Sequence, residues 1–240
     1  MCIRDRIYGG DGDDTIHGGN HADLIFGGNG NDSLSGSGGN GNDTLYGEDG
    51  DDTLRGGRSN DSIYGGNGRD LIRGDRGDDL IYGGAEFDTI YGQDGNDEIY
   101  GGENQGLIYG GIGDDSISGG ASKDTIYGED GNDSITGGDD DDVLEGGSGN
   151  DTIYGGGGND SINGGSGGNI LKGDSGNDTL IGGSANDRAL FNGNRSDYTL
   201  TYSNPAGALN TNSLTTNGTD GVDVITNVET LRFDDQDITN

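Results

Sequence analysis

A nine-residue unit, G-G-x-G-x-D-x-U-x with U a large aliphatic residue, repeats along most of this 240-residue chain. It begins with "GGDGDDTIH" (9–17) and "GGNHADLIF" (18–26), is interrupted by Gly36 and Ser37, and ends with "GGSANDRAL" (182–190), which makes 20 units. The first position is Gly in all 20, the sixth is Asp in 18, and the eighth is Ile or Leu in 19. Such regularity indicates a repeat architecture, in which each unit is completed by its neighbours.

The positions of the unit together predict an all-β fold. In the last three positions, as in Thr89-Ile90-Tyr91, an aliphatic residue alternates with outward-facing neighbours, which is typical of a short strand. Gly at the first, second and fourth positions allows backbone conformations closed to other residues, so we expect the first six residues to form a tight turn. Two units, about 18 residues, then make one coil whose Ile and Leu side chains meet in a thin interior.

The composition indicates that this fold needs a stabilising ligand from outside the chain. Only 26% of the residues are apolar, 56 are Gly and the formal net charge is −33, so the bare polypeptide cannot bury enough apolar surface to offset its conformational entropy. The charge argues against nucleic acid or an anionic membrane surface as a partner. The single Cys rules out an internal disulfide, and no apolar run approaches the roughly 18 residues of a membrane span.

The nonapeptide resembles the repeats-in-toxin (RTX), or haemolysin-type, calcium-binding motif over residues 9–190. The resemblance implies a parallel β-roll, a right-handed two-sheet solenoid in which calcium lies between turns one coil apart. Each ion would take the sixth-position carboxylates of two such turns and backbone carbonyls of the Gly-rich segments. The implied calcium ligands are the sixth-position residues Asp14, Asp23, Asp32, Asp43, Asp52, Asp61, Asp70, Asp79, Asp88, Asp97, Asp115, Asp124, Asp133, Asp142, Asp151, Asp160, Asp178 and Asp187.

The chemistry of the unit agrees with calcium independently. Calcium is a hard cation that takes six to eight oxygen ligands, whereas zinc would need more than the one Cys and two His present. Pairing each unit with the unit two further on gives 18 sites; two of these involve Gly106, so we expect up to about 16 Ca²⁺ ions. The alternative, that these Asp are only solvated turn residues, does not explain one fixed position in 18 copies.

Two units lack the sixth-position acid. Gly106 replaces it in "GGENQGLIY", and we expect this residue to lie between Asp88 and Asp124, where two adjacent sites would each lose a carboxylate. Asn169 keeps a neutral side-chain oxygen and is expected to be a milder defect between Asp151 and Asp187.

Two further series recur at every second unit, once per expected coil. Four replacements of the fourth-position Gly lie on one side of the roll, where we expect weaker calcium binding, with neutral drift as the alternative: Glu86, Asn104, Ser122 and Asp140. Ninth-position Tyr residues predict an aromatic ladder between neighbouring strands, with a glycan-binding stripe as the alternative: Tyr46, Tyr64, Tyr82 and Tyr100 in one series, Tyr91, Tyr109 and Tyr127 in the other.

Both ends of the chain depart from the repeat. We expect residues 1–6, "MCIRDR", to be a non-native leader, residues 7–190 to form the roll, and residues 191–240 to form a small C-terminal β cap. "DYTLTY" (197–202) predicts an antiparallel strand. A solenoid needs an end cap over its last apolar layer, and the residues expected to supply it are Val224, Ile225, Val228, Leu231 and Phe233.

The sequence favours a binding module over an enzyme. "GGSGG" (164–168) and "GSGGNG" (36–41) match catalytic or nucleotide-binding patterns only because Gly is abundant, and they lack the strand-turn-helix context. The family resemblance implies a calcium-induced fold in a secreted bacterial protein exported by type I secretion machinery. Two alternatives stay open: a non-catalytic fragment of a secreted metalloprotease or lipase, and a calcium-dependent adhesin or matrix protein with glycan or cell-surface contacts.

Overall fold

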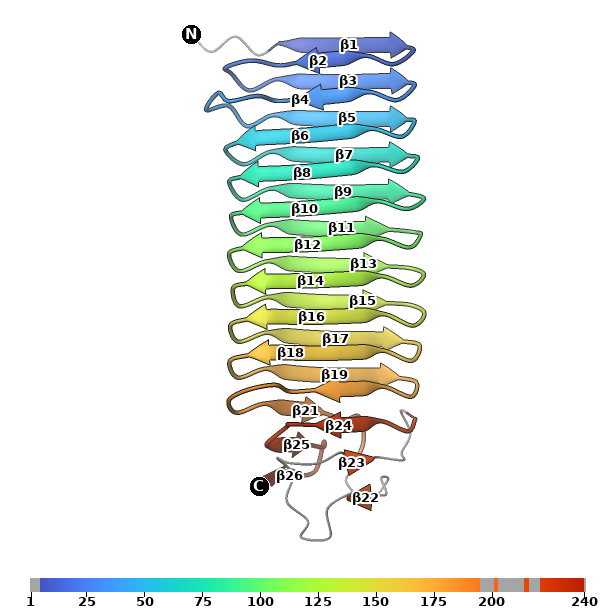
Figure 1. Cartoon of the computed structure of the whole chain (residues 1–240), viewed down its shortest axis with the longest axis vertical. Helices are drawn as coiled ribbons and strands as arrows, with labels where there is room; N and C mark the ends of the chain where they lie inside the picture. Colours follow the sequence, from blue (N-terminus) through green and yellow to red (C-terminus); the bar gives the residue numbers. More distant parts are fainter. Residues whose placement is uncertain (1–4, 195–200, 203–213, 216–220, 240) are drawn as a thin grey trace.

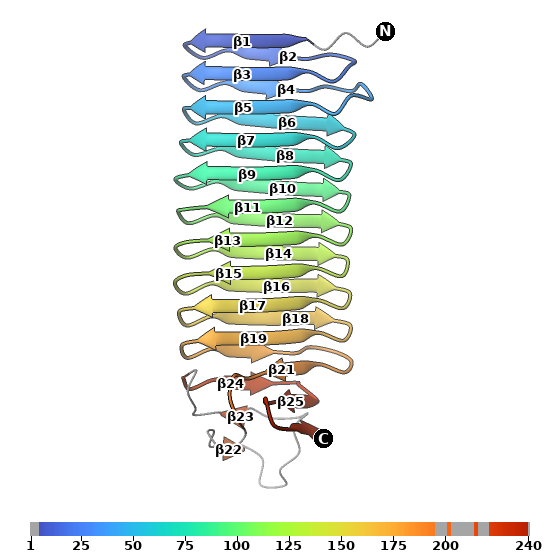
Figure 2. The same cartoon turned by 180° about the vertical axis from the view of Figure 1, so that it is seen from behind.

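The computed structural model is a β-solenoid of about ten coils, and it describes residues 5–194, 201–202, 214–215 and 221–239 (Figure 1). Strands alternate between two 13-stranded sheets that form the two long faces of the solenoid (Figure 2). The described residues contain strands and turns but no helix, and hence no helix long and apolar enough to cross a bilayer. The predicted all-β, two-sheet solenoid, with partners in register one coil of two units apart, is confirmed.

We call the two faces sheet A and sheet B. Sheet A contains, in spatial order, β1 (Arg6–Asp11), β3 (Leu24–Asn29), β5 (Thr44–Asp49), β7 (Ser62–Asn67), β9 (Leu80–Ala85), β11 (Glu98–Gly102), β13 (Ser116–Gly120), β15 (Ser134–Gly138), β17 (Thr152–Gly157), β19 (Ile170–Ser175), β21 (Arg188–Leu190), β25 (Thr230–Arg232) and β26 (Asp237–Thr239). Sheet B contains β2 (Thr15–His17), β4 (Ser33–Ser35), β6 (Thr53–Arg58), β8 (Leu71–Arg76), β10 (Thr89–Asp94), β12 (Leu107–Ile112), β14 (Thr125–Asp130), β16 (Val143–Ser148), β18 (Ser161–Ser166), β20 (Thr179–Ile181), β24 (Val224–Thr226), β23 (Leu214–Thr215) and β22 (Thr201–Tyr202).

The strands are longer than the sequence pattern predicts. Most have six residues rather than three, because the parallel ladder continues from the aliphatic triplet through the first three positions of the next unit. In β5 and β7, for example, Leu45 pairs with Ile63 and Glu48 with Gly66. The predicted six-residue turn is therefore wrong, and the turn that holds the sixth-position Asp is much shorter.

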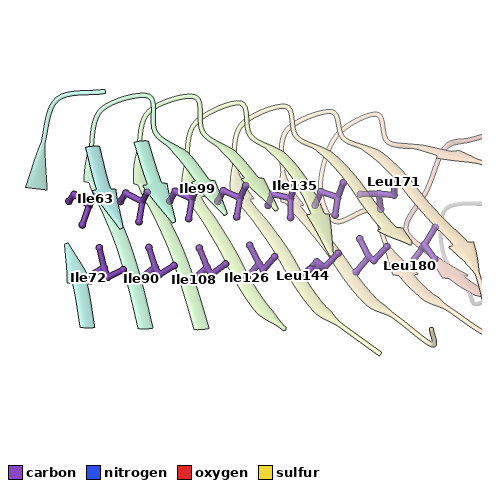
Figure 3. Close-up of a cluster of buried hydrophobic side chains, with 14 of the residues drawn as sticks. Ile63, Ile72, Ile90, Ile99, Ile108, Ile126, Ile135, Leu144, Leu171 and Leu180 are labelled. Atoms are coloured by element: carbon purple, nitrogen blue, oxygen red, sulfur yellow. The ribbon is translucent and has the colours of Figure 1, made fainter. Parts of the chain in front are cut away.

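The eighth-position side chains form the core. Their Ile and Leu residues are almost all fully buried and lie in two facing rows, one from each sheet (Figure 3). Neighbours along a row, such as Ile63 and Ile81, are one coil apart in register. Each fully buried Ile or Leu contributes about 1.5–3 kcal/mol, but the core is only one side chain deep from each sheet. The apolar layer fixes the register of the strands. Because it is thin, it makes only a limited contribution to the free energy of folding.

The two-residue interruption lies later in the chain than the sequence alignment places it. Gly36, not Gly38, occupies the first position of its unit, because a Cβ on Gly36 would meet the Asp43 carboxylate as in every regular unit. Ser37 has the positive φ of the second position, so the extra residues lengthen the turn before Asp43. The register step across this turn is longer by the two extra residues, which keeps Leu24 opposite Thr44.

The C-terminal region closes the solenoid by continuing it. β24 and β25 extend the two sheets in parallel, and β23, β22 and β26 then add antiparallel strands. Four of the five predicted cap residues are confirmed as buried: Ile225, Val228, Leu231 and Phe233. Val224 is 36% exposed because it stands next to Ile225 in β24 and faces outward. Of the predicted strand 197–202, only Thr201–Tyr202 lies within the described residues, paired antiparallel as expected.

Candidate metal centre

The turns form two columns along the solenoid. We call the turns that follow sheet A strands turn stack A, and those that follow sheet B strands turn stack B. The sixth-position residues of stack A are Asp14, Asp32, Asp52, Asp70, Asp88, Gly106, Asp124, Asp142, Asp160 and Asp178. Those of stack B are Asp23, Asp43, Asp61, Asp79, Asp97, Asp115, Asp133, Asp151, Asn169 and Asp187. Apart from the half-buried Asp14, every one of the predicted site carboxylates is only 1–3% exposed.

One side-chain oxygen of each sixth-position residue from Asp23 to Asp187, Gly106 excepted, accepts a backbone N–H of the preceding coil. The N–H of Asp61 donates to Oδ1 of Asp79 at 2.7 Å, and the N–H of Asp79 donates to Oδ1 of Asp97 at 2.8 Å. The same bond, at 2.7–3.1 Å, repeats along both stacks. The sixth-position side chain therefore has a structural role that is independent of any ion.

The other oxygen, Oδ2, is buried and without a hydrogen-bond partner in all of the predicted ligands except Asp43. In a typical turn, Oδ2 of Asp79 lies over Gly74, the first residue of its unit. A Cβ on Gly74 would be 2.3 Å from that oxygen and 2.8 Å from the carbonyl oxygen of Gly92, one coil further on. Two acceptors from adjacent coils thus approach the same point with no donor described between them, and buried acceptors left in this state are costly.

The first-position Gly is therefore required for space and not for backbone conformation. These residues do not have a positive φ, unlike the Gly at the second and fourth positions. In 18 of the 20 units a side chain at the first position would collide with the carboxylate of its own unit. In the other two units, a side chain at Gly101 or Gly164 would meet a backbone carbonyl oxygen of the next coil, so Gly is required in all 20 copies. The second and fourth positions do have positive φ, even where Glu48, Gln93 or Glu86 replaces Gly, with φ values of 79°, 80° and 76°.

The buried carboxylates receive no compensation from the basic residues. The ion pairs of the described residues all involve acids outside the predicted ligand set, such as Arg69 with Asp51 and Lys123 with Asp141. Burial raises the pKa of Asp79 to about 8; the Asp61 N–H opposes this rise, and the charges of Asp97 and Asp61 add to it. A column of buried like charges at this spacing needs an external cation to stay ionised near neutral pH.

The two sequence defects lie where they were predicted. Gly106 accepts a backbone bond from Thr125 and donates to Oδ1 of Asp124 at 2.7 Å, so it occupies the sixth position between Asp88 and Asp124. The Asp88 N–H, however, loses the side-chain acceptor that the sixth position supplies elsewhere. Asn169 keeps that role and accepts the N–H of Asp151 at 2.9 Å, while its amide nitrogen donates to carbonyl oxygens of Gly167 and Gly182. Asn169 thus preserves the bond but puts a donor where other units have a free oxygen.

A second ladder, which the sequence analysis missed, runs through the fifth position. Its Asn or Asp side chain accepts the N–H of the residue one coil later, as from Asp114 to Asn96 at 2.8 Å and from Asn132 to Asp114 at 2.7 Å. This direction is opposite to that of the sixth-position ladder, so each turn is tied to the coils before and after it. The signal was present in the sequence, because most units carry Asn or Asp at this position.

In turn stack A the fifth-position ladder is interrupted over the same coils in which the sixth-position ladder lacks one bond, the bond from the Asp88 N–H. The fifth-position residues there are Arg69, Phe87, Gln105 and Lys123, which lack the short carbonyl side chain of Asn and Asp, and Gly106 removes the sixth-position acceptor. The fourth-position replacements predicted to lie on one side, Glu86, Ser122 and Asp140 among them, fall in the same stack. Three independent features of the unit therefore fail together in this part of stack A.

Three carboxylates outside the predicted set continue the columns. Asp5 donates its N–H to Asp23 and extends the frame into the segment expected to be a leader. At the other end Asp223, 3% exposed, accepts from Asp178, and Glu229 Oε2 accepts from Asp187 at 2.7 Å. The sequence signal for Asp223 is "GTDGVDVIT" (218–226), a repeat that an insertion separates from the others.

The side-chain and backbone oxygens of the turns suit a hard cation as ligands. Among the described residues, no three acidic, His or Cys side chains converge on one point, so an ion would have to combine paired carboxylates with backbone carbonyls. Such an all-oxygen set is the ligand chemistry of calcium rather than of zinc. Fold and turns together define a parallel β-solenoid whose turns offer oxygen ligands of the kind that calcium prefers.

Comparison with known families agrees. The model of the RTX calcium-binding nonapeptide repeat (4 copies) matches residues 4–34, 37–72, 73–108, 105–135, 136–171 and 163–190. The chain belongs to this family, and its repeats form a calcium-binding repeat domain. A search of curated proteins found no match.

The ninth-position aromatic residues form the predicted ladders. On sheet A the rings of Tyr8, Phe26, Tyr46, Tyr64, Tyr82 and Tyr100 stack with centroids 4.7–5.2 Å apart and interplanar angles of 4–8°. On sheet B, Tyr91, Tyr109 and Tyr127 stack at 5.0 Å. Because each ring covers the faces of its neighbours, the interior rings have no free face on which a sugar could stack. The geometry favours the ladder interpretation over the glycan stripe.

Proposed function

We propose that both turn stacks bind calcium between turns one coil apart, with the sixth-position carboxylates of the two turns as side-chain ligands. The observation that carries this proposal is the series of buried Oδ2 atoms without a hydrogen-bond partner, most of which face a backbone carbonyl of the next coil. In a representative site, Asp79 and Asp97 would supply carboxylates and the Gly-rich segments would supply carbonyls. Asp223 and Glu229 would extend the two series at the C-terminal end.

Calcium binding is coupled to folding in this proposal. The metal-free coil would hold a column of buried carboxylates without counter-ions, and a core one side chain deep from each sheet cannot offset that cost. A site filled to about ten times its dissociation constant contributes about 1.4 kcal/mol. Sixteen such sites, the number expected from the sequence, would contribute about 20 kcal/mol as an upper bound. This is enough to decide between a disordered and a folded chain of this composition.

The same coupling suits a secreted protein. Extracellular calcium modules bind at about 10⁻⁴–10⁻³ M, so their sites stay empty in a cytosol and fill outside the cell. RTX repeat proteins are typically secreted, and we infer that this chain is exported unfolded by a type I machinery and folds on meeting external calcium. Its own role is then structural and ion-binding rather than catalytic.

Far-UV circular dichroism tests the coupling directly. In chelator the chain should give a spectrum of disordered polypeptide, and about 5 mM calcium should convert it to a β spectrum. Magnesium at the same concentration is the control, because its demand for octahedral geometry and retained water does not suit these turns. Identical spectra in chelator and calcium would contradict calcium-coupled folding, and an equal response to magnesium would contradict a selective site.

A further inference from the structure

Arginine side chains gather on the outer face of sheet B, in a chain whose net charge is −33. Arg55 and Arg58 lie on β6, and Arg73 and Arg76 lie on the neighbouring strand β8. Arg55, Arg58 and Arg76 line a hollow of about 510 Å³. Its other walls include Ser35 and Ser37 and the acidic residues Asp75 and Asp94. We call this hollow the arginine groove.

The strand register brings these cations together. Arg55 is paired with Arg73 and Arg58 with Arg76 across the parallel β6–β8 ladder, where strands are about 4.8 Å apart. Like charges on adjacent positions of a sheet are destabilising unless something neutralises them. Residues of successive coils meet in this way only in the folded solenoid, so the groove exists only in the folded chain.

Nearby groups neutralise the groove only in part. Arg55 pairs with Asp75, which also accepts a bond from Gln93 at 3.0 Å, and Arg76 lies 3.4 Å from Asp94 with both side chains more than half exposed. Arg73 lies over the ring of Tyr91 at 5.4 Å. Arg58 forms no ion pair with any described residue.

Thus Arg58 and the exposed faces of Arg55 and Arg76 present guanidinium donors to the same hollow. Guanidinium groups bind planar or tetrahedral oxyanions through paired hydrogen bonds, which makes arginine the usual residue for such recognition. We propose that the arginine groove binds an oxyanion carried by an acidic polysaccharide, either a sulfate ester or a carboxylate.

The surroundings favour a thin acidic polysaccharide over a larger anionic partner. A membrane surface or a nucleic acid would bring a dense array of negative charge against the acidic turn stacks that flank sheet B. A polysaccharide chain can place a single charged group in the groove. It can then continue along the same face beside the partly exposed rings of Tyr91, Tyr109 and Tyr127, whose edges bear hydroxyl groups for hydrogen bonding.

Fluorescence anisotropy with labelled dextran derivatives tests the proposal in buffer with calcium and about 0.15 M salt, where long-range attraction is screened. Dextran with a low degree of sulfation and dextran with a low degree of carboxymethylation form the two arms that distinguish the source of the oxyanion, and neutral dextran is the control ligand. At least one charged derivative should bind and the neutral one should not. Removing two guanidinium groups with Arg58→Gln and Arg76→Gln together should weaken that binding at least tenfold.

The matched control is Arg69→Gln with Lys123→Gln, which removes the same charge from turn stack A. It should change the affinity less than twofold. Equal weakening by both double variants would show that net charge alone causes the effect and would overturn the proposed site. Unchanged binding in Arg58→Gln/Arg76→Gln would also overturn it, because the polysaccharide would then bind through bridging calcium ions instead. Failure of both charged dextrans to bind would also overturn it. The circular dichroism of each variant in calcium shows that the solenoid is folded.

Discussion

Replacing Gly106 by Asp should create two calcium sites. The structure leaves space for this change, because a Cβ at position 106 would have Asp124 Oδ1 at 3.3 Å and the Asp88 carbonyl oxygen at 3.9 Å as its nearest neighbours. Gly106 does not have a positive φ, and Gly101 keeps open the space that the new carboxylate would fill. The variant would supply the missing partner to Asp88 on one side and to Asp124 on the other.

The size of the effect follows from the two sites and one hydrogen bond. Each site filled to ten times its dissociation constant contributes about 1.4 kcal/mol, or about 3 kcal/mol for both as an upper bound. The Asp88 N–H also regains its acceptor, which adds about 1 kcal/mol. For a chain of this length, a gain of this size raises Tm by on the order of 10 °C in calcium. Gly106→Asn is the matched control: it restores the acceptor without the charge and should give only about 1 kcal/mol.

Isothermal titration calorimetry and thermal unfolding in about 5 mM calcium measure both quantities. Gly106→Asp should bind up to two more ions than the parent chain and should exceed Gly106→Asn in Tm. Equal ion counts, together with equal Tm values for the Asp and Asn variants, would refute the pairing of carboxylates across coils.

Three further outcomes follow from the same structure. Gly65→Ala should lower the free energy of unfolding by at least about 2 kcal/mol, because its Cβ would lie 2.3 Å from Asp70 Oδ2. Gly157→Ala, whose Cβ would lie 3.8 Å from its nearest neighbour, should leave that free energy nearly unchanged; unfolding experiments in calcium measure both. Glu86→Gly should stabilise by about 1 kcal/mol, since φ there is 76°; no gain in Tm would contradict a strained backbone. In chelator, residual structure should be greatest below about pH 4 and fall as pH rises towards 8, because burial raises the pKa of Asp79 from 3.8 to about 8 and the folded form keeps the proton. Calcium should reverse this trend, since its ligands must be deprotonated. Circular dichroism measured against pH with and without calcium tests this, and the same pH dependence of the β signal in both conditions would contradict it.

The sequence predicts the solenoid well because one period carries nearly all of the information. Alternation around Ile90 and its equivalents sets the core, and a step of two units sets the register, so the sequence alone places Gly106 between Asp88 and Asp124. The length of the strands could not be predicted in the same way. A Gly at the first position is read as a turn former, yet in the structure it continues the strand ladder and gives space to a carboxylate.

The parts of the site that escaped prediction depend on contacts between coils. Asn96 and Asp114 look like ordinary turn residues until their side chains are seen to accept backbone N–H groups from the next coil. Asp223 is separated in sequence from the other repeats, and the pairing of β24 with β20 shows that it continues turn stack A. The arginine groove likewise arises from register, since Arg58 and Arg76 belong to successive coils and meet only across the β6–β8 ladder.

A crystal structure of the chain grown in calcium, with anomalous scattering measured, tests the central claim most directly. We predict calcium peaks along both turn stacks between carboxylates one coil apart, as between Asp79 and Asp97, with the peaks beside Gly106 missing or weak. Peaks confined to exposed acids such as Asp51 or Asp141, or buried Oδ2 atoms that bind only protons or water, would contradict it.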